Sequence, residues 1–253
     1  MGGDFGRQLV VSVDARGFGS SNDQRQRAIQ AGIFGVLDRA ADRAELDRSA
    51  WDRQHKGDGE LAVLPATVAA AEPVLIDGFV RELNAALAQH NHGLRGAQRL
   101  RLRLAIHFGV VAKDENGLSG QATVAVSRLV DCAQAKRALD FYDDADLVVV
   151  LSNTVFADSV VQRYTDLDPR LFRRVRVRSK EFDDDAFLFV PGHDVNEMPL
   201  TDTSHVDSDP TAPEPSRQAS RGGDRPHMQT GNNTFHGSVT VENGTIGNSW
   251  VQR

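Results

Sequence analysis

The stretch Arg53-Gln54-His55-Lys56-Gly57-Asp58-Gly59-Glu60-Leu61-Ala62-Val63 decides our interpretation of the fold. It predicts two short strands around a tight turn, because Asp-Gly is a strong hairpin signal and glycine adopts a positive φ without steric cost. Such a turn holds the Asp58 carboxylate at the rim of a sheet. A second carboxylate, Asp14, directly follows the β-branched run Leu9–Val13. The chain therefore offers two carboxylates, each at the end of a predicted strand.

Strands and helices alternate on both sides of this hairpin. Periodicity predicts strands over 9–13, 100–107, 145–151, 172–177 and 186–190, and helices over about 22–43, 67–90, 120–138 and 153–161. A hairpin inside such an alternation favours an α+β sandwich over a doubly wound parallel sheet. We therefore expect helices packed on a mostly antiparallel sheet.

Length and composition limit the class of protein. The 253 residues suffice for one domain of up to roughly 200 residues and an appendage. Lys+Arg 29 against Asp+Glu 35 argues against an electrostatic nucleic-acid binder. The single Cys132 excludes an internal disulfide, and the longest aliphatic run, 147–151, is too short for a bilayer. We expect a cytoplasmic protein with no membrane partner.

The composition changes after Pro191. Residues 1–192 are expected to form the globular domain, and 193–226, rich in Pro, Ser, Asp and Thr, a disordered linker. In 227–253, apolar residues are spaced by Gly and Asn, with little charge and no Pro. That pattern suits stacked strands with Asn ladders. A disordered end, or a lone hairpin at Asn243-Gly244, is an equally open interpretation.

Three blocks of the globular part stand in a distinctive order. They are Val11-Ser12-Val13-Asp14-Ala15-Arg16-Gly17-Phe18, then His55–Val63, and then Leu102–Gly109 followed by Gly120–Leu129. Together they resemble the catalytic domains of the class III nucleotide cyclases, the adenylyl and guanylyl cyclases. The ending over 172–190 is similar to that family's closing strands, so the resemblance covers about residues 5–192. It implies the ferredoxin-like sandwich of these cyclases.

The resemblance also implies an activity and a site. In the family, a nucleoside triphosphate becomes a 3′,5′-cyclic nucleotide and pyrophosphate, with two Mg²⁺ or Mn²⁺ ions held by oxygen ligands. The residues of this chain in the corresponding positions are Asp14, Asp58 and the Ala15 carbonyl for the metals, the backbone N–H groups of Gly17, Phe18 and Gly19 for the phosphates, and Arg128 for the pentavalent transition state. Family sites are shared between two subunits, so a head-to-tail homodimer is implied.

Three positions depart from the family pattern. Gln54 replaces the Lys of adenylyl or the Glu of guanylyl cyclases, Gly117 replaces a base-reading Asp or Cys, and Val124 replaces an Asn that positions the ribose. Such divergence is similar to the bacterial pyrimidine cyclases of anti-phage defence, which make cyclic UMP or cyclic CMP. The tail resembles short amyloid signalling motifs of bacterial defence proteins, which implies an effector partner bound through the tail.

Alternatives remain open at this point. Val124, Gly117 and the tail motivate a second hypothesis, a cyclase-like dimer without turnover that acts as a scaffold or nucleotide sensor and presents its tail to an effector. His107 and Cys132 are most simply core residues. Lys56 could contact a phosphate or be a charge that protects a hairpin edge from further pairing, and the pattern favours the second.

Overall fold

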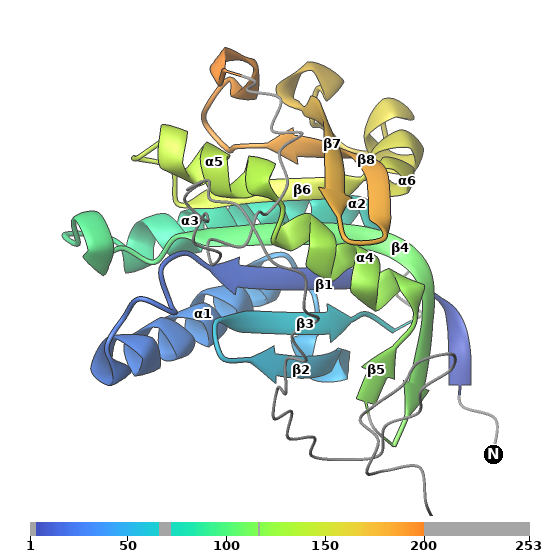
Figure 1. The fold of residues 1–253 in the computed structure, drawn as a ribbon, viewed down its shortest axis with the longest axis horizontal. Helices are drawn as coiled ribbons and strands as arrows, with labels where there is room; N and C mark the ends of the chain where they lie inside the picture. The colour runs from blue at the N-terminus through green and yellow to red at the C-terminus, as the bar shows by residue number, and fades with distance from the viewer. Residues whose placement is uncertain (1–3, 66–71, 116, 200–253) are drawn as a thin grey trace, which may run out of the picture. The chain divides into compact units, whose positions relative to one another are not determined.

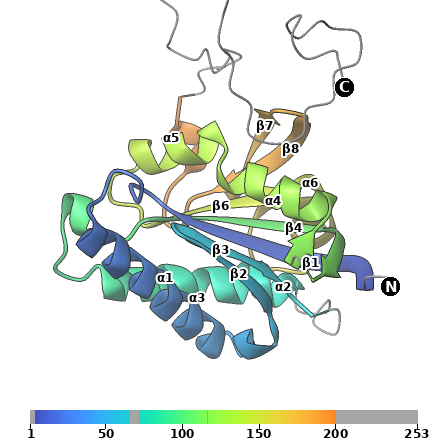
Figure 2. The same cartoon turned by 60° about the horizontal axis from the view of Figure 1, so that its bottom comes forward.

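The structure, a computed structural model, describes residues 4–65, 72–115 and 117–199. In this part of the chain, a single sheet lies between helices on both faces (Figures 1 and 2). The predicted α+β architecture is thus confirmed. The tail over 227–253, the linker from 200 onward and positions 67–71 of the expected helix over 67–90 lie outside the described residues.

The sheet has eight strands in the described residues, and its path starts with the hairpin. The order is β2 (Asp52–Lys56), β3 (Gly59–Val63), β1 (Asp4–Ala15), β4 (Leu102–Asp114), β6 (Leu147–Ser152), β8 (Phe182–Phe189) and β7 (Arg173–Ser179), while β5 (Gly117–Ser119) pairs with β4 off this path. Only β4 and β6 run parallel; the other pairs are antiparallel. The sheet is therefore mostly antiparallel, as predicted.

The helices divide between the two faces (Figure 2). One face is covered by α1 (Asp23–Arg43), α2 (Glu72–Val74) with a π-helical turn (Leu75–Phe79), α3 (Val80–His90), and α6 (Asn153–Val155) with a second π-helical turn (Phe156–Val161). The other face is covered by α4 (Gln121–Val130) and α5 (Ala133–Phe141). Short 3₁₀ turns occupy Arg48–Ala50, Gly96–Gln98, Pro169–Leu171 and Val195–Glu197.

Two hydrophobic cores result, one on each face of the sheet. Strand β6 contributes to both, since Leu147, Val149 and Leu151 join the α1/α3 core while Val148 and Val150 join the α4/α5 core. All its residues are buried. The uninterrupted aliphatic run at 147–151 is thus the pattern of a strand covered on both faces.

The predicted helix over 120–138 is in fact two helices, α4 and α5, broken at Asp131 and Cys132. Cys132 has extended backbone angles, with φ −64° and ψ 148°. The Val130 carbonyl, at the end of α4, accepts a hydrogen bond from Arg103 Nε at 3.1 Å. A side chain from β4 therefore caps the first helix where the sequence periodicity continues.

The hairpin turn also differs from the prediction in its detail. Its loop is Gly57-Asp58. Gly59 is the first residue of β3, and its φ is not positive. A Cβ atom at Gly59 would overlap the backbone carbonyl oxygen of Val13 on the neighbouring strand. Glycine is required here by the close approach of two strands rather than by turn conformation.

The packed part of the chain continues past the expected boundary at residue 192. Val195 and Met198 are buried in the α4/α5 core. The Tyr142 hydroxyl donates to the Asp194 carbonyl at 2.6 Å. Residues 193–199, which the sequence analysis assigned to the linker, thus pack on the domain.

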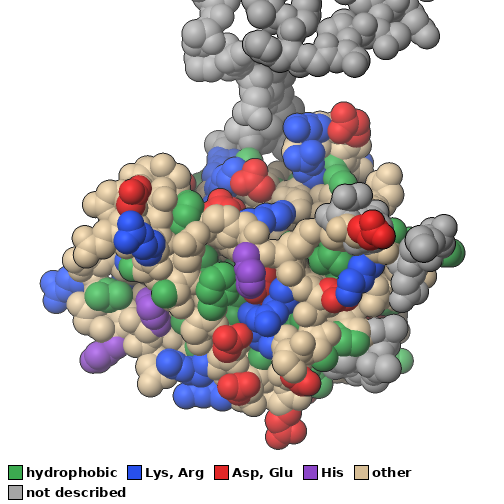
Figure 3. Space-filling model, turned by 90° about the horizontal axis from the view of Figure 1, so that it is seen from below, with side chains coloured by type: hydrophobic (Ala, Val, Ile, Leu, Met, Phe, Trp, Pro, Cys, Tyr) green, Lys and Arg blue, Asp and Glu red, His purple; other side chains and the backbone are tan. Residues whose placement is uncertain are grey.

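The surface carries charges of both signs. Lys and Arg side chains are interspersed with Asp and Glu on the face seen in Figure 3. Within the described ranges, no helix has both the length and the apolar character needed to cross a bilayer.

Candidate functional site

The fold brings the two predicted carboxylates to one edge of the molecule. Asp14 lies near the end of β1, opposite Gly59 of β3, and Asp58 lies in the adjoining turn. The Ala15 N–H donates to the Asp58 carbonyl oxygen at 2.8 Å, which fixes the turn against the strand end. Asp58 is therefore a neighbour in space of Asp14 and Ala15, the other predicted metal ligands, although more than 40 positions separate it from them in sequence.

Arg103 of β4 is the closest charged neighbour of Asp14. It lies directly opposite Asp14 in the sheet, and its Nη2 forms an ion pair with Asp14 Oδ2. The same guanidinium lies 3.8 Å from Asp131 Oδ1. The sequence analysis did not select Arg103, although strand alternation places it on the polar side of a buried strand.

Asp14 keeps one carboxylate oxygen without a partner. Its Oδ1 is buried and accepts no hydrogen bond from the described residues. Burial raises the pKa of Asp14, the Arg103 guanidinium lowers it, and the nearby Asp58 and Asp131 carboxylates raise it further, with a net upward shift. A bound cation would satisfy the orphaned oxygen and oppose the rise in pKa.

The oxygen donors at this edge suit a hard divalent cation. Carboxylate and backbone carbonyl oxygens are the ligands that Mg²⁺ and Mn²⁺ prefer. The described residues contain no group of three or more His, Cys, Asp and Glu side chains that could hold a metal by themselves. A metal here would therefore rest on Asp14, Asp58 and the Ala15 carbonyl, and would need further oxygens from substrate or water.

The loop after β1 exposes backbone N–H groups beside these carboxylates. Gly17 has φ +78°, and its carbonyl accepts from the Ser21 hydroxyl at 2.7 Å. The Phe18 carbonyl accepts from Gln26 Nε2 at 3.2 Å. In the described part of the chain, no hydrogen bond uses the N–H groups of Gly17, Phe18 and Gly19 as donors. These N–H groups are thus available to an anion near the start of α1.

The same loop packs against the hairpin turn. A Cβ atom at Gly57 would lie 3.3 Å from a ring carbon of Phe18, so the aromatic ring lies over the turn. Gln30 Nε2 of α1 donates to the Gly57 carbonyl at 2.9 Å. The loop, the first helix and the turn that carries Asp58 therefore form one connected unit.

Gln54 and Gly117, the two predicted base-reading residues, lie together. Gly117, on β5, has φ +108°, and a Cβ atom built on it would overlap Nε2 of Gln54. The Gln54 amide therefore occupies the space that a side chain at 117 would need.

Arg128 lies elsewhere in the same chain. It lines a pocket of about 440 Å³ between α4 and β4, together with Val124, His107 and Arg7, and neither Asp14 nor Asp58 lines that pocket. Val124 is 48% exposed. The pocket that Arg128 lines thus includes neither metal-ligand candidate, an arrangement compatible with a site shared by two subunits.

Cys132 and His107 are both predicted to be core residues, and the structure places them differently. Cys132 is buried, and burial raises the pKa of its thiol to about 11, so the thiol is unreactive at neutral pH. His107, by contrast, lines the Arg128 pocket, and its Nδ1 is buried without a hydrogen-bond partner in the described residues. Burial lowers the pKa of His107.

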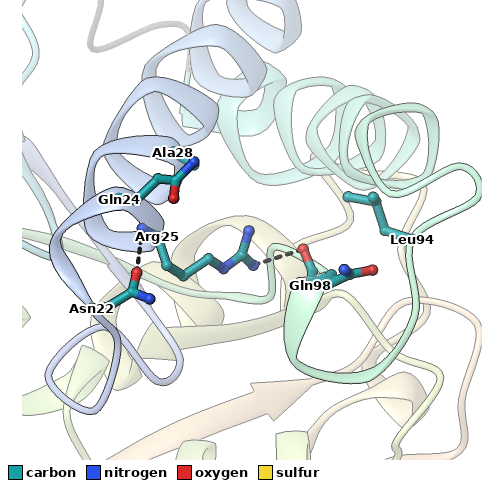
Figure 4. A pocket seen from close by; sticks show the side chains of 6 residues that line it. All are labelled: Asn22, Gln24, Arg25, Ala28, Leu94 and Gln98. Atoms are coloured by element: carbon teal, nitrogen blue, oxygen red, sulfur yellow. Dashed lines mark hydrogen bonds between the residues drawn. The ribbon is translucent and has the colours of Figure 1, made fainter.

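A further hollow of about 350 Å³ lies at the start of α1, and none of the predicted site residues lines it (Figure 4). Arg25 crosses it and donates from Nη2 to the Gln98 carbonyl at 2.6 Å and to the Ala97 carbonyl at 3.0 Å. Three carbonyls of one loop share this guanidinium, including that of Arg99 at 3.1 Å. Arg25 therefore fastens α1 to the loop before β4.

Comparison with solved structures identifies the fold, whereas no protein-family model and no curated protein sequence matches the chain. An adenylate/guanylate cyclase/hydrolase from Silicibacter pomeroyi superposes with a TM-score of 0.53 at 15% identity, over 75% of this chain and 99% of that one. The guanylate cyclase domain of RhGC from Catenaria anguillulae, solved with GTP, gives a TM-score of 0.51 at 13% identity, over 74% and 97% of the two chains. At such identities the likeness establishes the fold, which is that of adenylyl and guanylyl cyclase domains.

Proposed function

We propose that this protein is a metal-dependent nucleotide cyclase, which converts a nucleoside triphosphate to a 3′,5′-cyclic nucleotide and pyrophosphate in a site shared by two subunits. The observation that carries the proposal is the edge where Asp14 and Asp58 meet in a cyclase fold, with a buried Asp14 oxygen that has no partner. The nearby N–H groups of Gly17, Phe18 and Gly19 support it, since they can bind an anion.

In this reaction the 3′-oxygen forms a bond to the α-phosphorus, the bond from that phosphorus to the β-phosphate oxygen breaks, and the hydroxyl proton leaves to solvent. Bound Mg²⁺ or Mn²⁺ supplies acidification of the hydroxyl and charge neutralisation on the phosphates. Asp14, Asp58 and the Ala15 carbonyl would hold the metal. Arg128, from the other subunit, would stabilise the extra negative charge of the pentavalent transition state.

We extend the proposal to a pyrimidine nucleotide as the substrate. Neither charged residue of the purine cyclases is present at Gln54 or Gly117, and the Gln54 amide fills the space beside Gly117. An amide can both donate and accept, so it can pair with the edge of uracil or cytosine without a charged partner. A pyrimidine product would place the enzyme in defence-type signalling.

The test is product analysis by mass spectrometry. Purified protein is incubated with Mn²⁺ or Mg²⁺ and with each of the four ribonucleoside triphosphates separately. We expect a cyclic monophosphate and pyrophosphate from a pyrimidine nucleotide, and loss of both products in Asp58→Ala. Asp42→Asn, which changes an exposed carboxylate near the end of α1, should keep the activity and serves as the matched control.

No cyclic product from any of the four nucleotides, from a folded dimer, would contradict the proposal. Val124 favours a second candidate for that case, because an apolar side chain replaces the family's ribose-positioning amide on the exposed surface of α4. The protein would then be a dimeric scaffold or nucleotide sensor that recruits an effector through an amyloid-like tail. Fibrils that bind thioflavin, formed by the isolated 227–253 peptide, would support this role of the tail; a persistently soluble peptide would contradict it.

A further inference from the structure

Lys56 belongs to a row of side chains that crosses four strands at one level of the sheet. Lys56 of β2 lies opposite Gly59 of β3, Gly59 lies opposite Asp14 of β1, and Asp14 lies opposite Arg103 of β4. Residues that lie directly opposite one another project from the same face of a sheet. Lys56, Asp14 and Arg103 therefore share one face, and glycine separates the first two.

The two cations of this row have different partners. Arg103 is bound to Asp14 and to the Val130 carbonyl, and both its side chain and that of Asp14 are nearly buried, at 9% and 14% exposure. Lys56 is exposed, and its Nζ donates to the Ser127 hydroxyl at 3.2 Å. In the described ranges, no carboxylate lies within ion-pair distance of Lys56, although Asp58 is two residues away.

Gly59 keeps the space between Lys56 and Asp14 free of side chains. Two strand spacings separate the Lys56 and Asp14 backbones by about 10 Å. No side chain can be added at Gly59, because its Cβ would overlap the Val13 carbonyl. Gly59 itself is buried, so the row places an ammonium group and a carboxylate on either side of a strip of backbone that carries no side chain.

We propose that Lys56 binds the polyphosphate chain of the substrate, an assignment that rests on the proposed function. A phosphate oxygen is a stronger acceptor for an ammonium group than the neutral Ser127 hydroxyl, since both partners are charged. The N–H groups of Gly17, Phe18 and Gly19 approach the same edge from the loop that packs on the turn. Ser127 holds the ammonium group over the site until phosphate replaces it. This assignment replaces the edge-protecting role that the sequence favours.

The test measures binding of inorganic tripolyphosphate to the full chain by calorimetry, in the presence of Mn²⁺. This probe has no base and no ribose, so the result is independent of turnover. We expect Lys56→Gln to weaken binding by roughly tenfold or more, since hydrogen bonds to charged groups contribute about 1.5–3 kcal/mol. Lys56→Arg should retain most of the affinity. Arg81→Gln, which removes one positive charge from α3 on the opposite face of the sheet, is the matched control and should bind like the wild type.

Ser127→Ala separates phosphate binding from a purely structural tether between the hairpin and α4. If Lys56 binds phosphate, Ser127→Ala should change the affinity by less than about threefold, because the Ser127 hydroxyl only competes with phosphate for the ammonium group. Equal losses in Lys56→Gln and Ser127→Ala, with no further loss in the double variant, would overturn the proposal, as would wild-type affinity in Lys56→Gln. A folded protein that shows the Lys56 effect but makes no cyclic product would instead refute only the cyclase activity.

Discussion

Two carboxylate–guanidinium pairs lie on opposite faces of the same sheet, one register position apart. Glu60 of β3 pairs with Arg48 on the face that α1 covers, and Asp14 of β1 pairs with Arg103 on the face that α4 covers. Both Glu60 oxygens accept from Arg48, at 2.9 and 3.2 Å, and the remaining Arg48 Nε donates to Asp38 at 2.8 Å. Asp14, in contrast, keeps Oδ1 without a partner.

The difference separates an ion pair that stabilises the fold from one that is open to a ligand. At Glu60 every strong acceptor position is satisfied by the protein, so nothing is left for a ligand to bind. At Asp14 an unpartnered buried oxygen costs about 1–3 kcal/mol by ordinary standards. Proteins retain such groups mainly where they serve binding or catalysis. Comparison of the two pairs therefore points to Asp14 independently of any family resemblance.

The largest expected effect is the loss of folding stability when the Arg48–Glu60 ion pair is broken. Arg48→Met leaves the Glu60 carboxylate, 2% exposed, without its counter-ion, and should lower the free energy of unfolding by about 3–5 kcal/mol. It also removes the guanidinium from the face of Trp51, 5.2 Å from the ring centroid. Urea unfolding measures the change. Arg170→Gln, which breaks an exposed pair with Asp168, should leave the midpoint unchanged; equal effects of the two substitutions would contradict the distinction.

Removal of the charge from the Asp14–Arg103 pair should have the opposite effect on folding stability. Asp14→Asn keeps an acceptor for Arg103 but removes the buried negative charge, so the metal-free variant should unfold at or above the wild-type temperature. Wild type should gain about 2.7 kcal/mol from Mn²⁺ at a hundredfold excess over its Kd, and the variant should gain none. Differential scanning calorimetry with and without Mn²⁺ gives both values. Asp42→Asn, which removes an exposed carboxylate near the end of α1, should keep the Mn²⁺ response; a lost response there, or a retained one in Asp14→Asn, would place the metal elsewhere.

The sequence predicts those parts of the site that local patterns encode. The β-branched run before Asp14 and the turn signal at Asp58 each mark a strand end, and the order of motifs brings the two together. Arg103 is different, because strand alternation places both Arg101 and Arg103 on the same face without separating their roles. In the structure, Arg101 donates to carbonyls around the end of α5, at Tyr142 and Ala145 among others, whereas Arg103 reaches Asp14.

Other features depend on contacts between distant residues. At the break between α4 and α5, Arg103 of β4 bonds to the Val130 carbonyl, a contact that no periodicity within 120–138 can reveal. The contact of Gln54 with Gly117 joins β2 to β5, and the need for glycine at 59 comes from the Val13 carbonyl across the sheet. Each of these depends on the register of the strands. Register is set by the whole sheet rather than by the residues concerned.

The smallest expected effect is a pH dependence of folding stability that arises from Asp14. The pKa of folded Asp14 lies above its ordinary value of 3.8, so between these two pH values the folded state binds more protons than the unfolded state. The stabilising contribution of protonated Asp14 is fully present below pH 3.8 and is lost as the pH rises through the folded pKa. At neutral pH, wild type should therefore be less stable than Asp14→Asn.

The two proteins should converge as the pH is lowered through this window, since other titrating groups act alike in both. The Mn²⁺-induced stabilisation of wild type should decrease over the same range, because protons and cations compete for one carboxylate. Urea unfolding of both proteins at a series of pH values tests each statement. If the free energies of unfolding of wild type and Asp14→Asn change with pH in parallel, Asp14 titrates as an ordinary carboxylate. The partnerless oxygen would then be solvated in solution, and the contrast with Glu60 would be one of exposure rather than of function.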